Sequence, residues 1–254
     1  MMNKLTMPAL MAALSTLWED LPGTGREVAR CSVSLPALDA LLHGVSLADL
    51  HPMMPARAIR ARQLSFLAGR LCAEQALNRL GCVVTSVGRN ADGVPLWPEG
   101  FVGSISHSPT LAAAMAGRSN GAGGIGLDCE NVATGERLES ILALCCTAAE
   151  RVLLQPEIYP ALATLIFSAK EAGYKAIAHW LSRIPDFTEF EVCRFAPGAN
   201  RLWLAPVAGN EWHGCIAPFA VDFVLGPDSV QTIVDLRACR QRWATDQIAD
   251  AIGG

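Results

Sequence analysis

The sequence predicts an α+β protein made of two pseudosymmetric halves, each a long helix packed on a small, mainly antiparallel sheet. Three observations lead to this fold class. Hydrophobic residues make up 51% and charged residues 17% of the 254 residues, which is enough to bury a sizeable core. A long helix followed by short strand-like segments occurs twice along the chain. Glycines near residues 121–126 separate the two occurrences, so we expect halves over residues 1–123 and 124–254.

The N-terminal half is expected to centre on one long helix over residues 59–80. Leucines and alanines form an apolar stripe at helical spacing there, and Gly81 follows as a stop. Residues 1–18 resemble a signal peptide but lack a small-x-small cleavage site, so we interpret them as an amphipathic first helix. Three strand-like segments complete this half: residues 82–87, 101–106 and 111–116.

The C-terminal half is expected to begin with a strand over residues 125–129. A helix over residues 140–154 is broken near Thr147, which is placed to cap the piece that carries Glu150. A long helix over residues 161–181 follows, and a polar helix ends the chain. Four further strands are expected between these helices, over residues 187–195, 202–204, 215–225 and 230–236.

Charge and cysteine content exclude several classes of protein. With 20 basic and 24 acidic residues the formal charge is -4, which argues against a dedicated nucleic-acid binder. The nine cysteines are odd in number and form no CxxC pair, which favours buried thiols in a reducing compartment over disulfides or zinc. No segment offers the ~20 apolar residues that a membrane span needs. We therefore expect a cytoplasmic protein without a membrane span.

Two carboxylates lie two residues apart at the end of the strand expected over residues 125–129. Asp128 belongs to that strand, and Glu130 is the first residue after it. Asp128 and Glu130 therefore point to the same face. Carboxylates this close repel each other unless a cation lies between them or one of them is protonated. Magnesium is typically held by one or two protein carboxylates with water and phosphate oxygens. The alternative is a solvated strand end or a helix cap.

A second charged pair lies in the long helix of the C-terminal half. Glu171 and Lys175 are separated by four residues and share a helix face. The simplest interpretation is a surface ion pair, worth only ~0.3–0.5 kcal/mol. The functional interpretation makes Glu171 a third metal ligand and Lys175 a phosphate partner.

Arginines and one histidine mark the N-terminal half. Arg62 and Arg70 are eight residues apart on the expected helix, so both can reach one face, where a guanidinium suits phosphate. A solvated helix face is the alternative. His107 follows Ser106 at a strand end, which is no nucleophile–base arrangement because adjacent strand residues face opposite ways. His107 is either structural or a donor to phosphate.

Residues 121–126 match the string GxGxxG, the fingerprint of dinucleotide-binding proteins. That fingerprint needs a helix to begin at the glycines, whereas the residues that follow indicate a strand. We interpret the glycines as a flexible crossing between the halves. An NAD(P)-dependent oxidoreductase that uses residues 121–126 stays the main alternative enzyme class.

Together these motifs resemble the phosphopantetheinyl transferases, in particular the monomeric surfactin/enterobactin-synthase type. The resemblance covers roughly residues 60–180 and departs at Asp92, where relatives carry a basic residue, and at Phe167, where tryptophan is usual. Five segments carry it in the family's order: residues 62–70, 95–98, 103–107, 126–130 and 167–176.

The resemblance implies a function and a set of partners. The enzyme would move the 4′-phosphopantetheine arm of coenzyme A to a serine of an apo acyl, peptidyl or aryl carrier protein and release 3′,5′-ADP. Coenzyme A would lie between the halves of a monomer, with Mg²⁺ as cofactor and siderophore or other nonribosomal peptide synthesis as the pathway. A non-enzymatic module that binds coenzyme A or a carrier protein is the second alternative.

The resemblance also implies roles for individual residues. Magnesium would be held by Asp128, Glu130 and Glu171, with the backbone of Cys129 as a further candidate. The arginines for the phosphates of coenzyme A would be Arg62, Arg70 and Arg89, and the pocket wall would include Ser106 and His107. Lys175 would lie near the pyrophosphate, and the general base would be Glu171 or Glu150.

Overall fold

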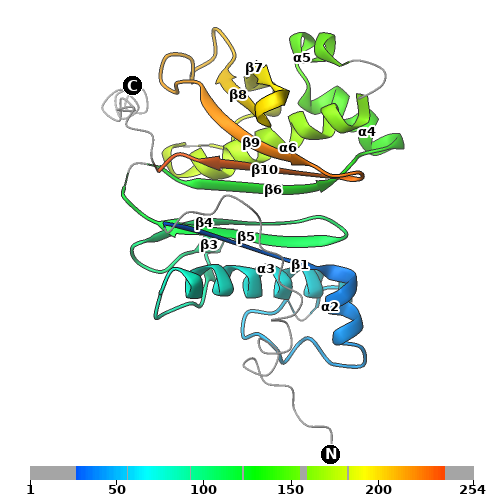
Figure 1. The fold of residues 1–254 in the computed structure, drawn as a ribbon, viewed down its shortest axis with the longest axis vertical. Coiled ribbons are helices and arrows are strands. Elements are labelled where there is room, and N and C mark those ends of the chain that lie inside the picture. The colour runs from blue at the N-terminus through cyan, green and yellow to red at the C-terminus, as the bar shows by residue number, and fades with distance from the viewer. Residues whose placement is uncertain are drawn as a thin grey trace, which may run out of the picture. The chain divides into compact units, whose positions relative to one another are not determined.

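The structure is a computed structural model that describes residues 27–55, 57–91, 93–121, 123–154, 159–181 and 183–237. The helices expected over residues 1–18 and at the C-terminus lie outside these residues. The backbone forms two compact units that divide between Ser119 and Asn120. Each unit places a long helix on one face of an antiparallel sheet (Figure 1). The predicted α+β class is therefore confirmed.

The first unit is built on a three-stranded sheet of order β1-β5-β4. Its strands are β1 (Val28–Ser34), β4 (Phe101–His107) and β5 (Leu111–Arg118), all antiparallel. The helix α3 (Arg60–Arg79) packs on this sheet. Alanines fill the contact from both sides, since Ala68, Ala73 and Ala76 of the helix and Ala112, Ala114 and Ala116 of β5 have no exposed area. These small side chains let the helix backbone lie close to the sheet.

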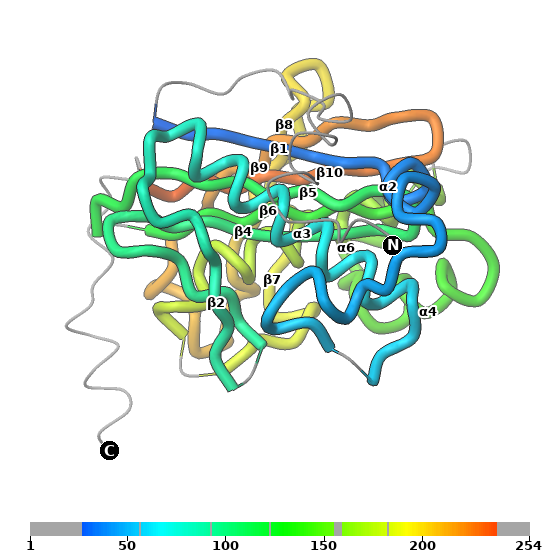
Figure 2. Tube along the Cα trace, turned by 90° about the horizontal axis from the view of Figure 1, so that it is seen from below, coloured from blue at the N-terminus to red at the C-terminus, as the bar shows by residue number. Residues whose placement is uncertain are grey.

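Three features of the first unit differ from the sequence predictions. The expected strand over residues 82–87 is absent, and its apolar side chains Val83 and Val84 are 97% and 64% exposed. Instead, a two-stranded ribbon forms from β2 (Gly88–Arg89) and β3 (Pro95–Leu96). The strand β1 and the short helix α2 (Leu35–Leu41) were not predicted. They follow each other directly, as Figure 2 shows, and Ser34 caps the helix by accepting from the Ala37 amide.

The second unit has a five-stranded antiparallel sheet of order β6-β10-β9-β8-β7. Its long helix α6 (Tyr159–Ile177) contacts β6 and β10 most extensively. The strands are β6 (Ile125–Asn131), β7 (Phe190–Ala196), β8 (Arg201–Pro206), β9 (Phe219–Leu225) and β10 (Ser229–Asp235). The strand expected over residues 215–225 is shorter than predicted, because the chain turns as far as Ile216 and β9 begins only at Phe219.

Two short helices connect β6 to α6. They are α4 (Gly135–Cys145) and α5 (Ala148–Leu153), which confirms the predicted break near Thr147. Thr147 accepts from the Glu150 amide, and the Glu150 carboxylate accepts from the Thr147 amide, which is a complete capping box.

Gly124 and Gly126 are contact residues rather than parts of a flexible crossing, whereas a Cβ atom on Gly121 would meet no other atom within 4 Å. A Cβ atom on Gly124 would lie 2.4 Å from the Ala176 carbonyl oxygen, and one on Gly126 would lie 1.7 Å from that of Ala172. Only glycine permits the backbone of β6 to approach α6 this closely. Because Gly126 already belongs to β6 and a strand follows, the dinucleotide-binding interpretation of residues 121–126 is wrong.

Candidate functional site

An acidic cluster lies in the second unit between β6 and α6. Asp128 and Glu130 alternate with Cys129 along β6, while Glu171 and Lys175 stand on α6. Asp128 is paired with Thr232 of the neighbouring strand β10. The structure therefore brings together two charged pairs that are more than 40 residues apart in the sequence.

Lys175 is the main cationic partner within this cluster. Its Nζ donates to Oδ1 of Asp128 at 2.7 Å and to the Leu127 carbonyl at 3.1 Å, and it lies 4.0 Å from Oε2 of Glu171. Asp128 is buried, whereas the Lys175 side chain is 31% exposed. The ion pair of Lys175 with Glu171 on the same helix is thus longer than its ion pair with Asp128, which joins α6 to β6.

The carboxylates of the cluster repel one another. Burial and, after it, the charge of Asp128 raise the pKa of Glu130 to about 7, although Arg137 and Lys175 partly offset their effect. Oε2 of Glu130 accepts from Arg137 at 2.5 Å. Burial also raises the pKa of Glu171, with Lys175 acting in the opposite direction. Groups of this kind favour an additional cation.

The donor set of the cluster fits a hard divalent cation. Its ligands are carboxylate oxygens, which magnesium prefers, and their mutual repulsion would be relieved by positive charge. In the described part of the chain no three or more His, Cys, Asp or Glu side chains are already grouped to hold a metal ion. The ammonium of Lys175 lies beside Oδ1 of Asp128, and a carboxylate oxygen has a second lone pair with which it can bind a cation.

Glu150 lies in a separate, sealed environment. It forms an ion pair with Lys170 at 2.7 Å, and neither side chain has any exposed area. Its other contacts are backbone amides: Oε1 accepts from Val192 and Oε2 from Thr147. Lys170 donates in addition to the Cys145 carbonyl at 2.7 Å. Glu150 thus joins α5 to β7 and α6 through buried hydrogen bonds and has no contact with solvent.

The cysteines near this pair are not activated. Cys145 and Cys146 are buried free thiols. Burial raises the pKa of each to about 11, so the nucleophilic thiolate form is suppressed.

Arginines of the first unit gather around an aromatic ring. The guanidinium carbons of Arg70 and Arg89 lie 5.2 and 5.6 Å from the centre of the Phe66 ring. Arg70 is only 5% exposed, and its Nη1 is buried with no hydrogen-bond partner. Burial and the neighbouring charge of Arg89 lower the pKa of Arg70. Two close guanidinium groups, one with an unused donor, are suited to bind an anion.

Arg62 has a different partner from Arg70. Its Nη1 lies 3.1 Å from Nε2 of His107 at the end of β4. His107 is exposed while Ser106 is buried, as strand alternation predicts. Arg62 and His107 therefore form a second polar group on the first unit.

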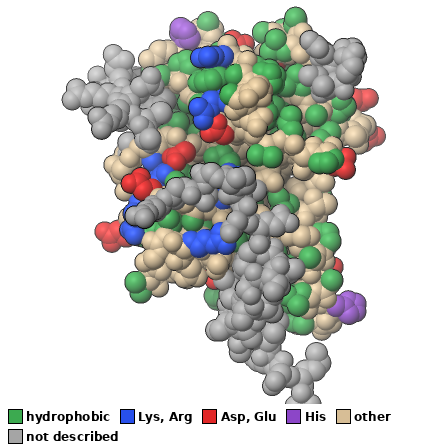
Figure 3. All heavy atoms as spheres, viewed as in Figure 1, with side chains coloured by type: hydrophobic (Ala, Val, Ile, Leu, Met, Phe, Trp, Pro, Cys, Tyr) green, Lys and Arg blue, Asp and Glu red, His purple; other side chains and the backbone are tan. Residues whose placement is uncertain are grey.

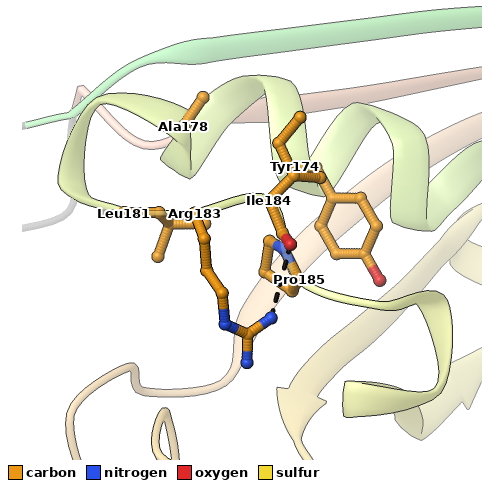
Figure 4. Close-up of a pocket in the computed structure, with 6 residues that line it drawn as sticks. All are labelled: Tyr174, Ala178, Leu181, Arg183, Ile184 and Pro185. Carbon is orange, nitrogen blue, oxygen red and sulfur yellow. Dashed lines mark hydrogen bonds between the residues drawn. The ribbon is translucent and has the colours of Figure 1, made fainter.

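A pocket of about 180 Å³ lies at the C-terminal end of α6 and the loop that follows (Figure 4). It does not contain the acidic cluster, and Arg183 is its one charged lining residue. That arginine is neutralised by Glu189 and Glu211. The lining residues are Tyr174, Ala178, Leu181, Arg183, Ile184 and Pro185.

Four residues that contact the candidate groups were not singled out from the sequence. Ser168 has a detectable signal, because it precedes Glu171 by three and Lys175 by seven residues and so shares their helix face. Phe66 has one too, because it precedes Arg70 by four residues on the same helix. Lys170 and Thr232 depend on contacts between distant segments, which spacing does not encode.

Two family models match this chain, one in each unit. A family model described as "4'-phosphopantetheinyl transferase N-terminal domain" matches residues 51–117, within the first unit. A model described as "4'-phosphopantetheinyl transferase superfamily" matches residues 124–226, within the second. The second match includes the whole acidic cluster.

Curated relatives support the same assignment. Enterobactin synthase component D of Salmonella typhimurium is 35% identical over 149 residues, which are 58% of this chain and 61% of the relative. The 4'-phosphopantetheinyl transferase Npt of Nocardia iowensis is 34% identical over 54% of this chain and 63% of the relative. PptT of Mycobacterium tuberculosis is 34% identical over 48% of this chain and 53% of the relative. The chain thus spans between 53% and 63% of the length of these relatives.

The chain belongs to the 4′-phosphopantetheinyl transferase superfamily. Within the described residues, no helix combines the length and the apolar character needed to cross a membrane.

Proposed function

We propose that the protein transfers the 4′-phosphopantetheine arm of coenzyme A to a serine of an apo carrier protein and releases 3′,5′-ADP. The single observation that carries the proposal is the convergence of Asp128, Glu130, Glu171 and Lys175 in a chain of this superfamily. Relatives named enterobactin synthase component D favour a carrier of siderophore or other nonribosomal peptide synthesis. The expected monomeric state and cytoplasmic location stay predictions.

The acidic cluster would hold magnesium through Asp128, Glu130 and Glu171, with the backbone of Cys129 as a further candidate. When bound, Mg²⁺ supplies positive charge that offsets the charge building up on the pyrophosphate during transfer. Lys175 would bind a phosphate oxygen. Arg70, Arg89 and Arg62 would bind phosphate groups of coenzyme A, and His107 with Ser106 would line its pocket.

Glu171 is the better candidate for the general base. A base must reach the hydroxyl that it deprotonates, and the Glu171 side chain is 33% exposed whereas that of Glu150 has no exposed area. Glu171 would take the proton of the carrier serine, directly or through water. The serine oxygen then bonds to the phosphorus next to the pantetheine arm, and the bond from that phosphorus to the bridging oxygen of the leaving 3′,5′-ADP breaks.

The proposal is tested by incubating the protein with coenzyme A, Mg²⁺ and apo carriers of fatty-acid, polyketide and nonribosomal-peptide type, and weighing each carrier. We expect one carrier to gain the mass of a phosphopantetheine arm. Failure to modify any carrier, with coenzyme A binding intact, would favour the non-enzymatic binding module.

Replacing Arg70 with methionine is expected to raise the KM for coenzyme A about tenfold or more and to change kcat less. The variant keeps side-chain volume but removes a charge-assisted hydrogen bond, worth about 1.5–3 kcal/mol. Steady-state kinetics with varied coenzyme A measure this. Exposed Arg57, changed to methionine in the same unit, is the control. An unchanged KM for coenzyme A would remove Arg70 from the binding site.

Replacing Lys175 with alanine is expected to lower kcat at least about tenfold more than it weakens coenzyme A binding. The reason is that a cation beside the transferred phosphate stabilises the transition state, in which negative charge develops, more than it stabilises the bound substrate. Lys175→Arg keeps the charge and should retain more activity than Lys175→Ala. Equal losses in kcat and in affinity would instead make Lys175 a ground-state binder.

A patch of exposed apolar side chains on α4 and α5 is our candidate for the carrier contact. Leu144, Val152 and Leu153 are 69%, 84% and 48% exposed, and Figure 3 shows hydrophobic side chains at the surface in this region. Val152→Glu is expected to raise the KM for the carrier about tenfold, or 1.4 kcal/mol, without changing the KM for coenzyme A. Ile184, which is 83% exposed elsewhere in the second unit, serves as the matched control in Ile184→Glu. Equal effects of both variants would refute the patch.

A further inference from the structure

Two buried hydroxyl groups lie next to Asp128, on the side of its Oδ2 atom. Ser168 of α6 donates through Oγ to Oδ2 of Asp128 at 2.8 Å. Oγ1 of Thr232, on β10, lies 2.9 Å from that Oγ and 2.8 Å from the Ser168 carbonyl oxygen. Neither hydroxyl residue has any exposed area. The three side chains therefore form a closed polar chain from β10 through α6 to β6.

The protons in this chain can be assigned by counting donors. Asp128 as a carboxylate only accepts, so the single hydroxyl proton of Ser168 points to Oδ2. The single proton of Thr232 is then donated either to the Ser168 carbonyl or to the Ser168 Oγ. A proton donated to Oγ bonds the Ser168 side chain itself, whereas a proton donated to the carbonyl bonds the helix backbone at Ser168 and leaves the two hydroxyl oxygens in contact at 2.9 Å.

The direction of Ser168 is unusual for a serine inside a helix. Such serines often donate to the carbonyl one turn earlier in the same helix. Ser168 donates across to the neighbouring strand instead, and this fixes the plane and orientation of the Asp128 carboxylate. Because Oδ2 accepts from Ser168, Oδ1 is the oxygen that accepts from Lys175.

We infer that Ser168 and Thr232 are positioning residues that determine which oxygen of Asp128 is offered to the divalent cation. The inference rests on the proposed function for the presence of that cation and concerns only how this chain prepares its ligand. Hydrogen bonds behind a ligating side chain hold it in the binding orientation, and their loss typically weakens metal binding about 10- to 100-fold.

The test measures metal binding directly rather than activity. Full-length wild type, Ser168→Ala, Thr232→Val and Thr232→Ser are titrated with Mn²⁺ in the presence of coenzyme A, and free Mn²⁺ is followed by electron paramagnetic resonance. A titration of Mn²⁺ with coenzyme A alone provides the baseline. We expect about 10- to 100-fold weaker Mn²⁺ binding for Ser168→Ala. We expect weaker binding for Thr232→Val, which keeps the shape but loses the hydroxyl, and wild-type binding for Thr232→Ser.

Several results would overturn the inference. These are wild-type Mn²⁺ affinity in Ser168→Ala, or equal losses in Thr232→Val and Thr232→Ser, because shape rather than the hydroxyl would then matter. Thermal unfolding of the metal-free variants separates the two roles: lower stability with unchanged Mn²⁺ affinity would make both residues merely structural. A wild type that modifies a carrier but binds no Mn²⁺ would refute the inference and leave the proposed transfer standing.

Discussion

Changing Asp128 to asparagine is expected to reduce phosphopantetheine transfer at least about 1000-fold, equivalent to about 4 kcal/mol of transition-state stabilisation. Asparagine keeps the size of the side chain and can still accept from Ser168, but it lacks the charge that pairs with Lys175 or a metal ion. The initial rate of carrier modification measures the effect, and circular dichroism checks that the fold is retained.

An exposed aspartate of the same unit gives the matched control for this change. Asp222 on β9 accepts from Arg201 at 2.6 Å, and both side chains are about half exposed. Because exposed ion pairs contribute only about 0–1 kcal/mol, Asp222→Asn should leave transfer within about twofold of wild type. Transfer by Asp128→Asn within about tenfold of wild type would show that the acidic cluster is not the reaction centre.

Changing Lys170 to methionine is expected to destabilise the protein by about 3–5 kcal/mol. The substitution leaves the Glu150 carboxylate buried without its cationic partner, and single losses from buried ion pairs cost about this much. Against a total stability of about 5–15 kcal/mol, the shift is large. Urea denaturation followed by fluorescence measures the free energy of unfolding.

The double variant Lys170→Met with Glu150→Gln tests both the stability and the role of Glu150. Removing both charges should recover part of the lost stability, since no unpaired charge stays buried. The recovered protein should also transfer phosphopantetheine, because we assign the general base to Glu171. A folded but inactive double variant would return that role to Glu150. A single variant within about 1 kcal/mol of wild type would contradict the account of the buried pair.

Local patterns predicted the long helices well and failed where a segment depended on a distant partner. The helices α3 and α6 lie within four residues of their predicted ends, because each has a long apolar face. The valine-rich residues 82–87 have the composition of a strand but no neighbouring strand to bond, so they stay irregular. In strand β1 the buried apolar residues Ala29, Cys31 and Val33 alternate with polar residues, a pattern that is typical of a strand.

For the candidate site, the sequence predicted the charged residues but not their partners. Two-residue spacing placed Asp128 and Glu130 on one face, and helical spacing joined Glu171 to Lys175. That Lys175 would bond chiefly to Asp128 depends on how β6 packs against α6, which no local pattern encodes. The same holds for Glu150, whose spacing cannot reveal that Lys170 seals it from solvent.

The contact at Gly126 determines the distance between the backbones of β6 and α6. Because a Cβ there would overlap the Ala172 carbonyl, the strand and the helix lie as close as two backbones permit. Asp128 follows two residues later on the strand, and Ala172 adjoins Glu171 on the helix. The distance between the backbones that carry the Asp128 and Glu171 carboxylates is thus determined by this backbone contact. A single added methyl group at Gly126 would force the strand and the helix apart and so move Asp128 away from Glu171 and Lys175 without altering any of these side chains.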